Sequence, residues 1–276
     1  MNEKMNVLQA AGSIILIIFL LYLLAIMPRM IKRPSKKAFL NHYYAHRGFY
    51  NNHSEAPENS MAAFRMALER KYGIELDVQL SKDGIPVVFH DEYLERVCGI
   101  KGYLKDYTYK ELQTFFLYDS KETMPTFQEV LNLIDGKVPL IVEIKCEDGD
   151  TAVCRYAYEL LKNYKGVYCV ESFHPFAVHW FKKNVPHLVR GQLSSNFYMA
   201  GEKRIIMKAL GDLLFNFYAK PDFIAYNCLY TNTLSRRLCK NLYGALPVAW
   251  TIRSQKQLET YRKEYKLFVF EGFEPK

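Results

Sequence analysis

Two carboxylates stand two residues apart in an apolar stretch of the chain, Ile74-Glu-Leu-Asp-Val-Gln-Leu80. Side chains of a β-strand alternate between its faces, so Glu75 and Asp77 lie on one face and the apolar residues on the other. Glu143 stands in a later apolar run with the same alternation. Clustered carboxylates are costly to bury unless a cation neutralises them, and oxygen ligands suit Ca²⁺ or Mg²⁺. The three acids are therefore candidate metal ligands.

Two histidines and two basic side chains accompany these acids. His46 and Arg47 follow a short apolar run at residues 43–45, His90 ends a second strand-like run, and Lys145 shares a strand face with Glu143. Histidine titrates near neutral pH and suits acid–base catalysis, whereas arginine and lysine bind anions such as phosphate. A divalent metal, two cations and two histidines together are typical of phosphodiester cleavage.

Simpler interpretations exist for the same residues. The acids could pair with Arg47 and Lys145 as buried salt bridges that hold no metal. A single histidine in a strand-rich sequence is more often an ordinary core residue than a catalytic one. Two histidines beside a carboxylate cluster favour the functional interpretation.

Strand-like and helix-like segments alternate from residue 43 onward. Strands are predicted at 43–47, 73–80, 86–90, 138–145, 167–173, 188–193, 222–226, 246–252 and 267–270. Apolar strands that alternate with helices indicate a parallel sheet covered on both faces. About eight such strands in roughly 230 residues fit an α/β barrel of the TIM type, in which strand ends converge on one mouth. A doubly wound open sheet is the alternative, but no glycine-rich phosphate loop follows the first strand.

The first 42 residues differ from the rest of the chain. Residues 7–27 are apolar apart from two polar side chains, and a helix of this length would span roughly 30 Å, about one bilayer core. A cleaved signal peptide is the alternative, but no small-x-small cleavage site follows. We expect a single-pass transmembrane anchor at 7–27, a basic juxtamembrane linker at 28–42 that reaches at most about 50 Å, and a barrel at 43–276. The basic residues after the anchor place that barrel in the cytoplasm.

Net charge and cysteine spacing exclude some classes of protein. The formal net charge is +8, and most of the excess precedes residue 41. The remainder is too evenly spread for a nucleic-acid-binding surface. The six cysteines form no CxxC pair, which favours buried free thiols in a reducing compartment.

The order and spacing of the polar motifs resemble the glycerophosphodiester phosphodiesterase family. The motifs that carry the resemblance are His46-Arg-Gly48, Pro57-Glu-Asn59, Glu75-Leu-Asp77, Lys82-Asp-Gly84, His90-Asp91 and Glu143-Ile-Lys145. Ser172-Phe173 and Ala249-Trp-Thr251 resemble weaker landmarks of the family, so the likeness extends from about Tyr43 to Ile252. It ends before the last strand, where many members have Thr-Asp-Pro and this chain has Phe270-Glu-Gly-Phe273.

The resemblance implies a fold and a reaction. The fold is a TIM barrel with a short insertion after the second strand, here residues 91–125. The reaction is hydrolysis of a glycerophosphodiester to glycerol 3-phosphate and an alcohol with the help of one divalent cation. The implied roles are metal ligands for Glu75, Asp77 and Glu143, acid–base catalysis for His46 and His90, and phosphate binding for Arg47 and Lys145.

Three further residues are weaker candidates for contact with the substrate. Asn59 precedes a predicted helix, and the simpler alternative is that its side chain merely caps that helix. Phe173 and Trp250 could form an apolar wall for the glycerol or alcohol group, and ordinary core aromatics fit equally well.

Three other functions remain open at this point. A lysophospholipase D acting on membrane lyso-lipids is the nearest alternative. A metal-independent phospholipase C is also a barrel that uses histidines, but the three carboxylates argue against it. An inactive, tethered barrel that serves as a binding module would have no use for the complete set of polar residues.

Overall fold

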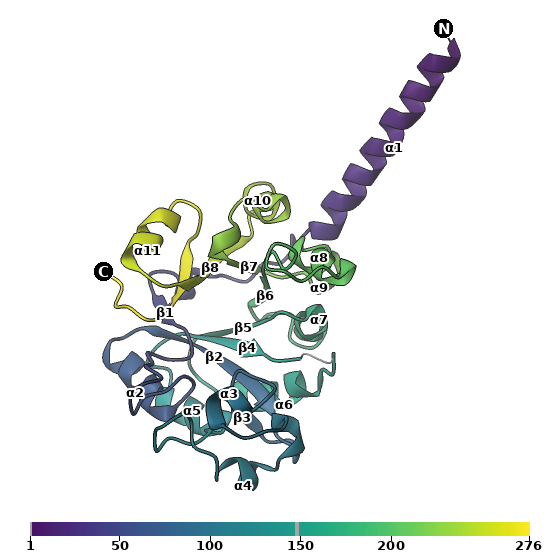
Figure 1. Ribbon diagram of the computed structural model, residues 1–276. Coiled ribbons are helices and arrows are strands. Elements are labelled where there is room, and N and C mark those ends of the chain that lie inside the picture. Colours follow the sequence, from purple (N-terminus) through teal and green to yellow (C-terminus); the bar gives the residue numbers. More distant parts are fainter. Residues whose placement is uncertain (1, 147–148) are drawn as a thin grey trace.

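Eight parallel strands close into a barrel in the computed structural model, which describes residues 2–146 and 149–276 (Figure 1). The strands are β1 (Tyr43–Ala45), β2 (Gly73–Leu80), β4 (Leu140–Ile144), β5 (Tyr168–Ser172), β6 (Arg190–Ser194), β7 (Phe223–Asn227), β8 (Leu246–Ile252) and β9 (Leu267–Phe270). Tyr44 of β1 pairs with Gly73 of β2 on one side and with Val269 of β9 on the other, which closes the sheet. The predicted TIM barrel is confirmed.

Helices follow the strands and cover the outside of the barrel (Figure 1). They are α2 (Met61–Glu69), α5 (Phe127–Ile134), α6 (Ala152–Leu161), α7 (Pro175–Asn184), α8 (Ile205–Gly211), α9 (Asn216–Ala219), α10 (Leu234–Asn241) and α11 (Gln255–Tyr261). The start of α5 shows how the sequence fixes such an element. Thr126 and Glu129 form a reciprocal capping box, and the apolar residues that follow at helical spacing are buried against the sheet.

The strand after β2 departs from the predicted pattern. β3 (Pro86–Val88) runs antiparallel to the end of β2, with Val78 opposite Val88, and lies outside the barrel. The prediction that all strands run parallel is wrong here, because the short turn at 81–84 can join only antiparallel strands. β3 and the short helices α3 (Glu95–Cys98), η2 (Leu104–Asp106) and α4 (Tyr109–Leu112) share a separate apolar cluster. The insertion therefore begins before residue 91.

An apolar helix, α1 (Asn2–Ile26), extends away from the barrel (Figure 1). Its part Asn6–Ile26 has the length and hydropathy of a membrane span or of a signal sequence. Its last turn packs against the barrel. Ile26 is fully buried in an apolar cluster with Leu213 and Ile224, and Tyr22 and Leu23 pack on the same cluster.

The basic segment after α1 lies on the barrel surface. The guanidinium of Arg29 is 3.5 Å from a carboxylate oxygen of Asp222, and that of Arg33 donates to the Tyr243 carbonyl. Phe39, in the short helix η1 (Lys37–Phe39), is 5% exposed and packs into the end of the barrel opposite the mouth. Side chains of this basic segment thus hold it against the barrel at several points.

Ile26→Ala should lower the free energy of unfolding of the full-length chain by about 2–4 kcal/mol, because it leaves a cavity in a closed apolar cluster. Urea titration in detergent, followed by circular dichroism, measures this change. Ile31, which is 76% exposed, provides the matched control, and Ile31→Ala should change stability by less than about 0.5 kcal/mol. If both substitutions changed the free energy of unfolding equally, packing of the end of α1 would not contribute to the stability of the barrel.

Candidate active site

Three carboxylates meet where β2 and β4 run side by side. Asp77 of β2 lies opposite Glu143 of β4 in the parallel ladder, and Glu75 points to the same side as Asp77. Oxygen atoms of the three residues lie within 4.8 Å of one another, and all three side chains are buried. This donor set could hold a hard divalent cation.

Two cations already contact this cluster. Lys145 Nζ lies 3.0 Å from Asp77 Oδ1 and 2.6 Å from Glu143 Oε1, and Arg47 Nε lies 3.5 Å from Asp77 Oδ2. Burial opposes ionisation of Asp77, but Lys145, His90 and Arg47 together hold its pKa well below its usual range. Burial, followed by repulsion from Asp77 and Glu143, raises the pKa of Glu75 well above its usual range. The two cations thus leave part of the cluster's negative charge without compensation, so the residues present fit a divalent metal.

The loop after β1 is held against the same carboxylates. The Arg47 backbone N–H donates to Glu75 Oε2 at 3.0 Å, and the Asn59 side chain donates to Asp77 Oδ2 at 2.8 Å. Both Arg47 and Asn59 adopt a positive φ, near 55° and 59°, which turns the chain sharply at these points. Ser60, and not Asn59, caps helix α2. Asn59 is 1% exposed and orients a carboxylate.

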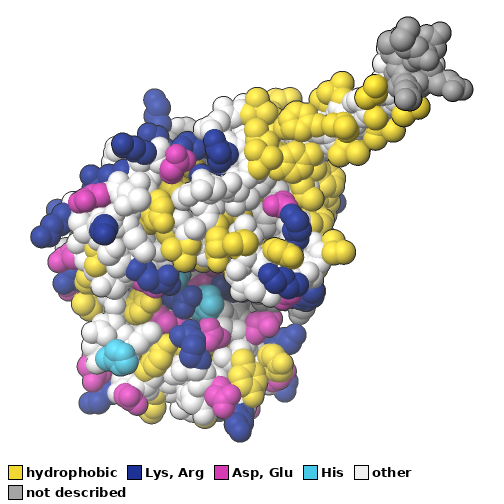
Figure 2. Space-filling view, turned by 45° about the horizontal axis from the view of Figure 1, so that its top comes forward, with side chains coloured by type: hydrophobic (Ala, Val, Ile, Leu, Met, Phe, Trp, Pro, Cys, Tyr) yellow, Lys and Arg dark blue, Asp and Glu magenta, His cyan; other side chains and the backbone are white. Residues whose placement is uncertain are grey.

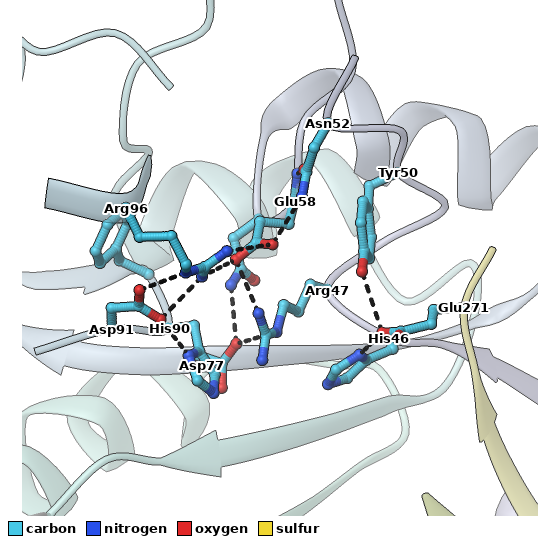
Figure 3. A network of polar contacts seen from close by, with 12 residues as sticks. His46, Arg47, Tyr50, Asn52, Glu58, Asp77, His90, Asp91, Arg96 and Glu271 are labelled. Atoms are coloured by element: carbon cyan, nitrogen blue, oxygen red, sulfur yellow. Dashed lines mark hydrogen bonds and ion pairs between the residues drawn. The ribbon is translucent and has the colours of Figure 1, made fainter. Parts of the chain in front are cut away.

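His46 binds a carboxylate that the sequence interpretation missed. Its Nδ1 lies 2.5 Å from Glu271 Oε2, which also accepts from the Tyr50 hydroxyl at 3.1 Å (Figure 3). Arg253 donates to the other Glu271 oxygen at 2.7 Å. Burial opposes ionisation of Glu271, but the hydrogen bond and charge of His46 and the charge of Arg253 lower its pKa to about 2. Burial, followed by the charge of Arg47, lowers the pKa of His46.

His90 belongs to a second network of charged contacts (Figure 3). Its Nδ1 lies 2.6 Å from Asp91 Oδ1, and Arg96 donates both to Asp91 and to Glu58. Glu58 also accepts from Arg47 at 2.8 Å, so this network reaches the phosphate-binding candidate beside the carboxylates. His90 reaches the site because antiparallel β3 returns the chain to the level of Asp77, whose carbonyl accepts from the Phe89 N–H.

A small pocket of about 130 Å³ opens beside the carboxylates. Figure 2 shows a hollow that contains a histidine and is surrounded by charged side chains of both signs. Phe173 and Trp250 line the pocket with their rings 5.4 Å apart, edge to face. Glu171 of β5 also lines it and was missed, although an acid inside the apolar run 167–173 was a usable signal. Burial, followed by Glu143 and Asp77, raises the pKa of Glu171 well above its usual range.

Residues 46–264 match the model of the glycerophosphoryl diester phosphodiesterase family. The chain belongs to this family. It is 37% identical over 160 residues to a glycerophosphodiester phosphodiesterase of Bacillus altitudinis, a match that covers 52% of this chain and 63% of the relative. It is 33% identical over 128 residues to human lysophospholipase D GDPD1, covering 45% and 38% of the two chains. An Oleispira antarctica phosphodiesterase, solved with its product sn-glycerol-3-phosphate, superposes with a TM-score of 0.68 at 25% identity, covering 85% and 94%.

Nine of the ten site residues predicted for this family member lie at the pocket or directly behind it. His46, Arg47, Glu75, His90, Glu143, Phe173 and Trp250 line the pocket, and Asp77 and Lys145 contact lining residues. Asn59 lies behind Asp77 and outside that lining.

Glu271→Gln should destabilise this family member in a pH-dependent way. Because folding depresses the pKa of Glu271 to about 2, the stability from its ionisation is complete above its unfolded pKa of about 4.5. That stability is lost as the pH falls from there toward 2, so the difference between wild type and variant should shrink over this window. Urea titrations at a series of pH values measure it. Glu274→Gln, at a 61% exposed carboxylate, is the control, and a parallel change in both variants would contradict the assignment.

Proposed function

We propose that this chain is a metal-dependent phosphodiesterase that hydrolyses glycerophosphodiesters to glycerol 3-phosphate and an alcohol. One observation carries the proposal: two histidines and a cluster of three buried carboxylates lie at the same small pocket. The relatives named for this activity support it, as does the structure of a family member with glycerol 3-phosphate.

The proposed roles follow from the contacts. Glu75, Asp77 and Glu143 would hold one Ca²⁺ or Mg²⁺, which when bound polarises phosphoryl oxygens and lowers the pKa of the attacking hydroxyl. Arg47 and Lys145, already ion-paired at this cluster, would bind the phosphate.

His46 and His90 would share the proton transfers. One histidine accepts the proton of the neighbouring glycerol hydroxyl as that oxygen attacks phosphorus, and the other donates a proton to the departing alcohol oxygen. Water then opens the resulting cyclic phosphate and yields glycerol 3-phosphate.

We further propose that residues 7–27 form an uncleaved single-pass anchor, 28–42 a juxtamembrane segment and 43–276 a cytoplasmic catalytic domain. Burial of Ile26 in the barrel's cluster supports an anchor that remains attached. The basic residues after the helix support the orientation.

A lysophospholipase D activity is the second candidate. The aromatic pair Phe173 and Trp250 at the pocket would suit an apolar substrate group, and α1 would hold the site near lipids. The human relative named lysophospholipase D supports this alternative.

Release of glycerol 3-phosphate from glycerophosphocholine tests the main proposal. The full-length chain in detergent should be active with Ca²⁺ or Mg²⁺ and inactive in EDTA, and His46→Ala or His90→Ala should lower kcat by about 10²-fold or more. His53→Ala, at an exposed histidine, is the control and should leave the rate unchanged.

Other results would redirect the assignment. Full activity in EDTA would favour metal-independent phospholipase chemistry. A wild type that cleaves lysophosphatidylcholine and leaves glycerophosphocholine intact would favour the lysophospholipase D. Inactivity on both substrates with either metal would favour the binding module.

Asn59→Ala separates a role in orienting a metal ligand from contact with the substrate. Because Asn59 donates to Asp77, its loss should raise the metal concentration needed for half-maximal activity about 10–100-fold, with KM nearly unchanged. Titration of activity with Ca²⁺ and with Mg²⁺ measures this change. A raised KM at an unchanged metal requirement would instead place Asn59 against the substrate, as the sequence predicted.

A further inference from the structure

The segment between β6 and α9 exposes apolar side chains that the proposed reaction does not use. Ile205 and Ile206, at the start of α8, are 87% and 50% exposed, and Tyr198 and Met199 in the preceding loop are 44% and 67% exposed. Single exposed apolar residues are ordinary on a protein surface, but four within residues 198–206 form a patch that calls for a partner. We call these four residues the α8 patch.

The α8 patch lies next to the point where α1 leaves the barrel. α8 leads directly into Leu213 and Leu214, which belong to the apolar cluster that holds the last turn of α1. Figure 1 shows α8 and α9 beside the base of α1. A bilayer crossed by α1 would therefore begin close to the patch.

The same segment also borders the mouth of the barrel. It follows the carboxyl end of β6, and carboxyl strand ends form the mouth in this fold. The ring of Phe197 lies 6.0 Å from that of Phe173, which lines the pocket. In Figure 2, hydrophobic side chains lie along α1 and on the side of the hollow that faces it. The α8 patch thus lies between the apolar helix and the pocket.

Basic side chains accompany the α8 patch. Lys203, Arg204 and Lys208 are exposed within or beside it, and Lys203 Nζ lies 4.0 Å from the centre of the Tyr198 ring. Glu202 and Asp212 pair with Arg204 and Lys208, which leaves an excess of one positive charge in the segment. Aliphatic, aromatic and cationic side chains on one surface are typical of segments that lie in the headgroup region of anionic bilayers.

We propose that the α8 patch enters the headgroup region of the bilayer that α1 spans, so that the mouth of the barrel rests beside the lipid surface. The pinned last turn of α1 favours a bilayer over a partner protein, because the barrel cannot swing its patch away from the membrane. The inference extends the proposed function, since a mouth in this position favours substrates that reside in the bilayer, such as lysophospholipids.

Fluorescence quenching tests the contact without any assay of activity. The full-length variant Ile206→Trp is placed in vesicles of phosphatidylcholine and phosphatidylglycerol whose acyl chains carry bromine. The added fluorescence should fall at least about twofold relative to unbrominated vesicles, because the side chain lies at the acyl boundary. Phe116→Trp is the control, at a 56% exposed site four residues after the end of α4. Figure 1 shows α4 on the side of the barrel away from α1. Equal quenching of the two variants, or quenching of neither, would overturn the proposal.

A pair of substitutions tests the consequence for the substrate. The double variant Ile205→Glu and Ile206→Glu should hydrolyse lysophosphatidylcholine in vesicles about tenfold more slowly, since charge repels the patch from the bilayer. Its hydrolysis of soluble glycerophosphocholine should not change, and Phe116→Glu should change neither rate.

The outcomes distinguish this inference from the proposed function. An equal loss on both substrates, or on neither, would contradict the membrane contact. A wild type inactive on both would contradict the proposed function while leaving the quenching result valid. If the Ile206→Trp variant is not quenched and the double glutamate variant alters the oligomeric size in detergent, the patch belongs to an interface between two copies, and the proposal fails.

Discussion

The burial of three carboxylates side by side is the constraint on which the rest of this site depends. The alternation of β2 fixes Glu75 and Asp77 on one face, and the parallel register with β4 then places Glu143 opposite Asp77. In a protein interior such crowding is unfavourable without positive charge. Lys145 and Arg47 supply part of that charge, and a divalent cation would supply more. The barrel brings both basic residues and the pocket to the same strand ends because its strands are parallel.

The two histidines face this charge in different surroundings. The side chain of His46 is 14% exposed and bound to Glu271, whereas that of His90 is 32% exposed and bound to Asp91. Glu58 links the surroundings of His90 to the carboxylate cluster, because it pairs with both Arg47 and Arg96. Each imidazole is thus fixed through Nδ1, which directs its Nε2 away from the supporting carboxylate. Two imidazoles held at fixed angles beside one pocket, with unequal access to water, would suit the separate proton transfers of the proposed reaction.

Local sequence was enough to predict the elements and most of the pocket. Alternation in β2, the cap of α5 and the order of strands and helices depend on neighbouring residues, so they can be read without a structure. Glu271 could not be found in this way, because its contact with His46 exists only once β9 pairs with β1 and joins the two ends of the barrel sequence. The position of His90 depends likewise on the turn that makes β3 run antiparallel to β2. The apolar pattern of residues 86–90 does not distinguish such a strand from a parallel strand of the barrel.

The segment from Ile26 to Phe39 couples the apolar helix to the barrel at several points. Ile26 is buried on the outer side of β7, Arg29 pairs with Asp222 beside the start of that strand, and Phe39 fills the barrel end opposite the mouth. A flexible tether would let the pocket sample every orientation within its reach, which the length of residues 28–42 limits to about 50 Å. The docked path removes that freedom. The direction in which the pocket opens is therefore fixed by the same contacts that stabilise the fold, and any membrane that holds α1 also sets the approach of substrate to the carboxylates.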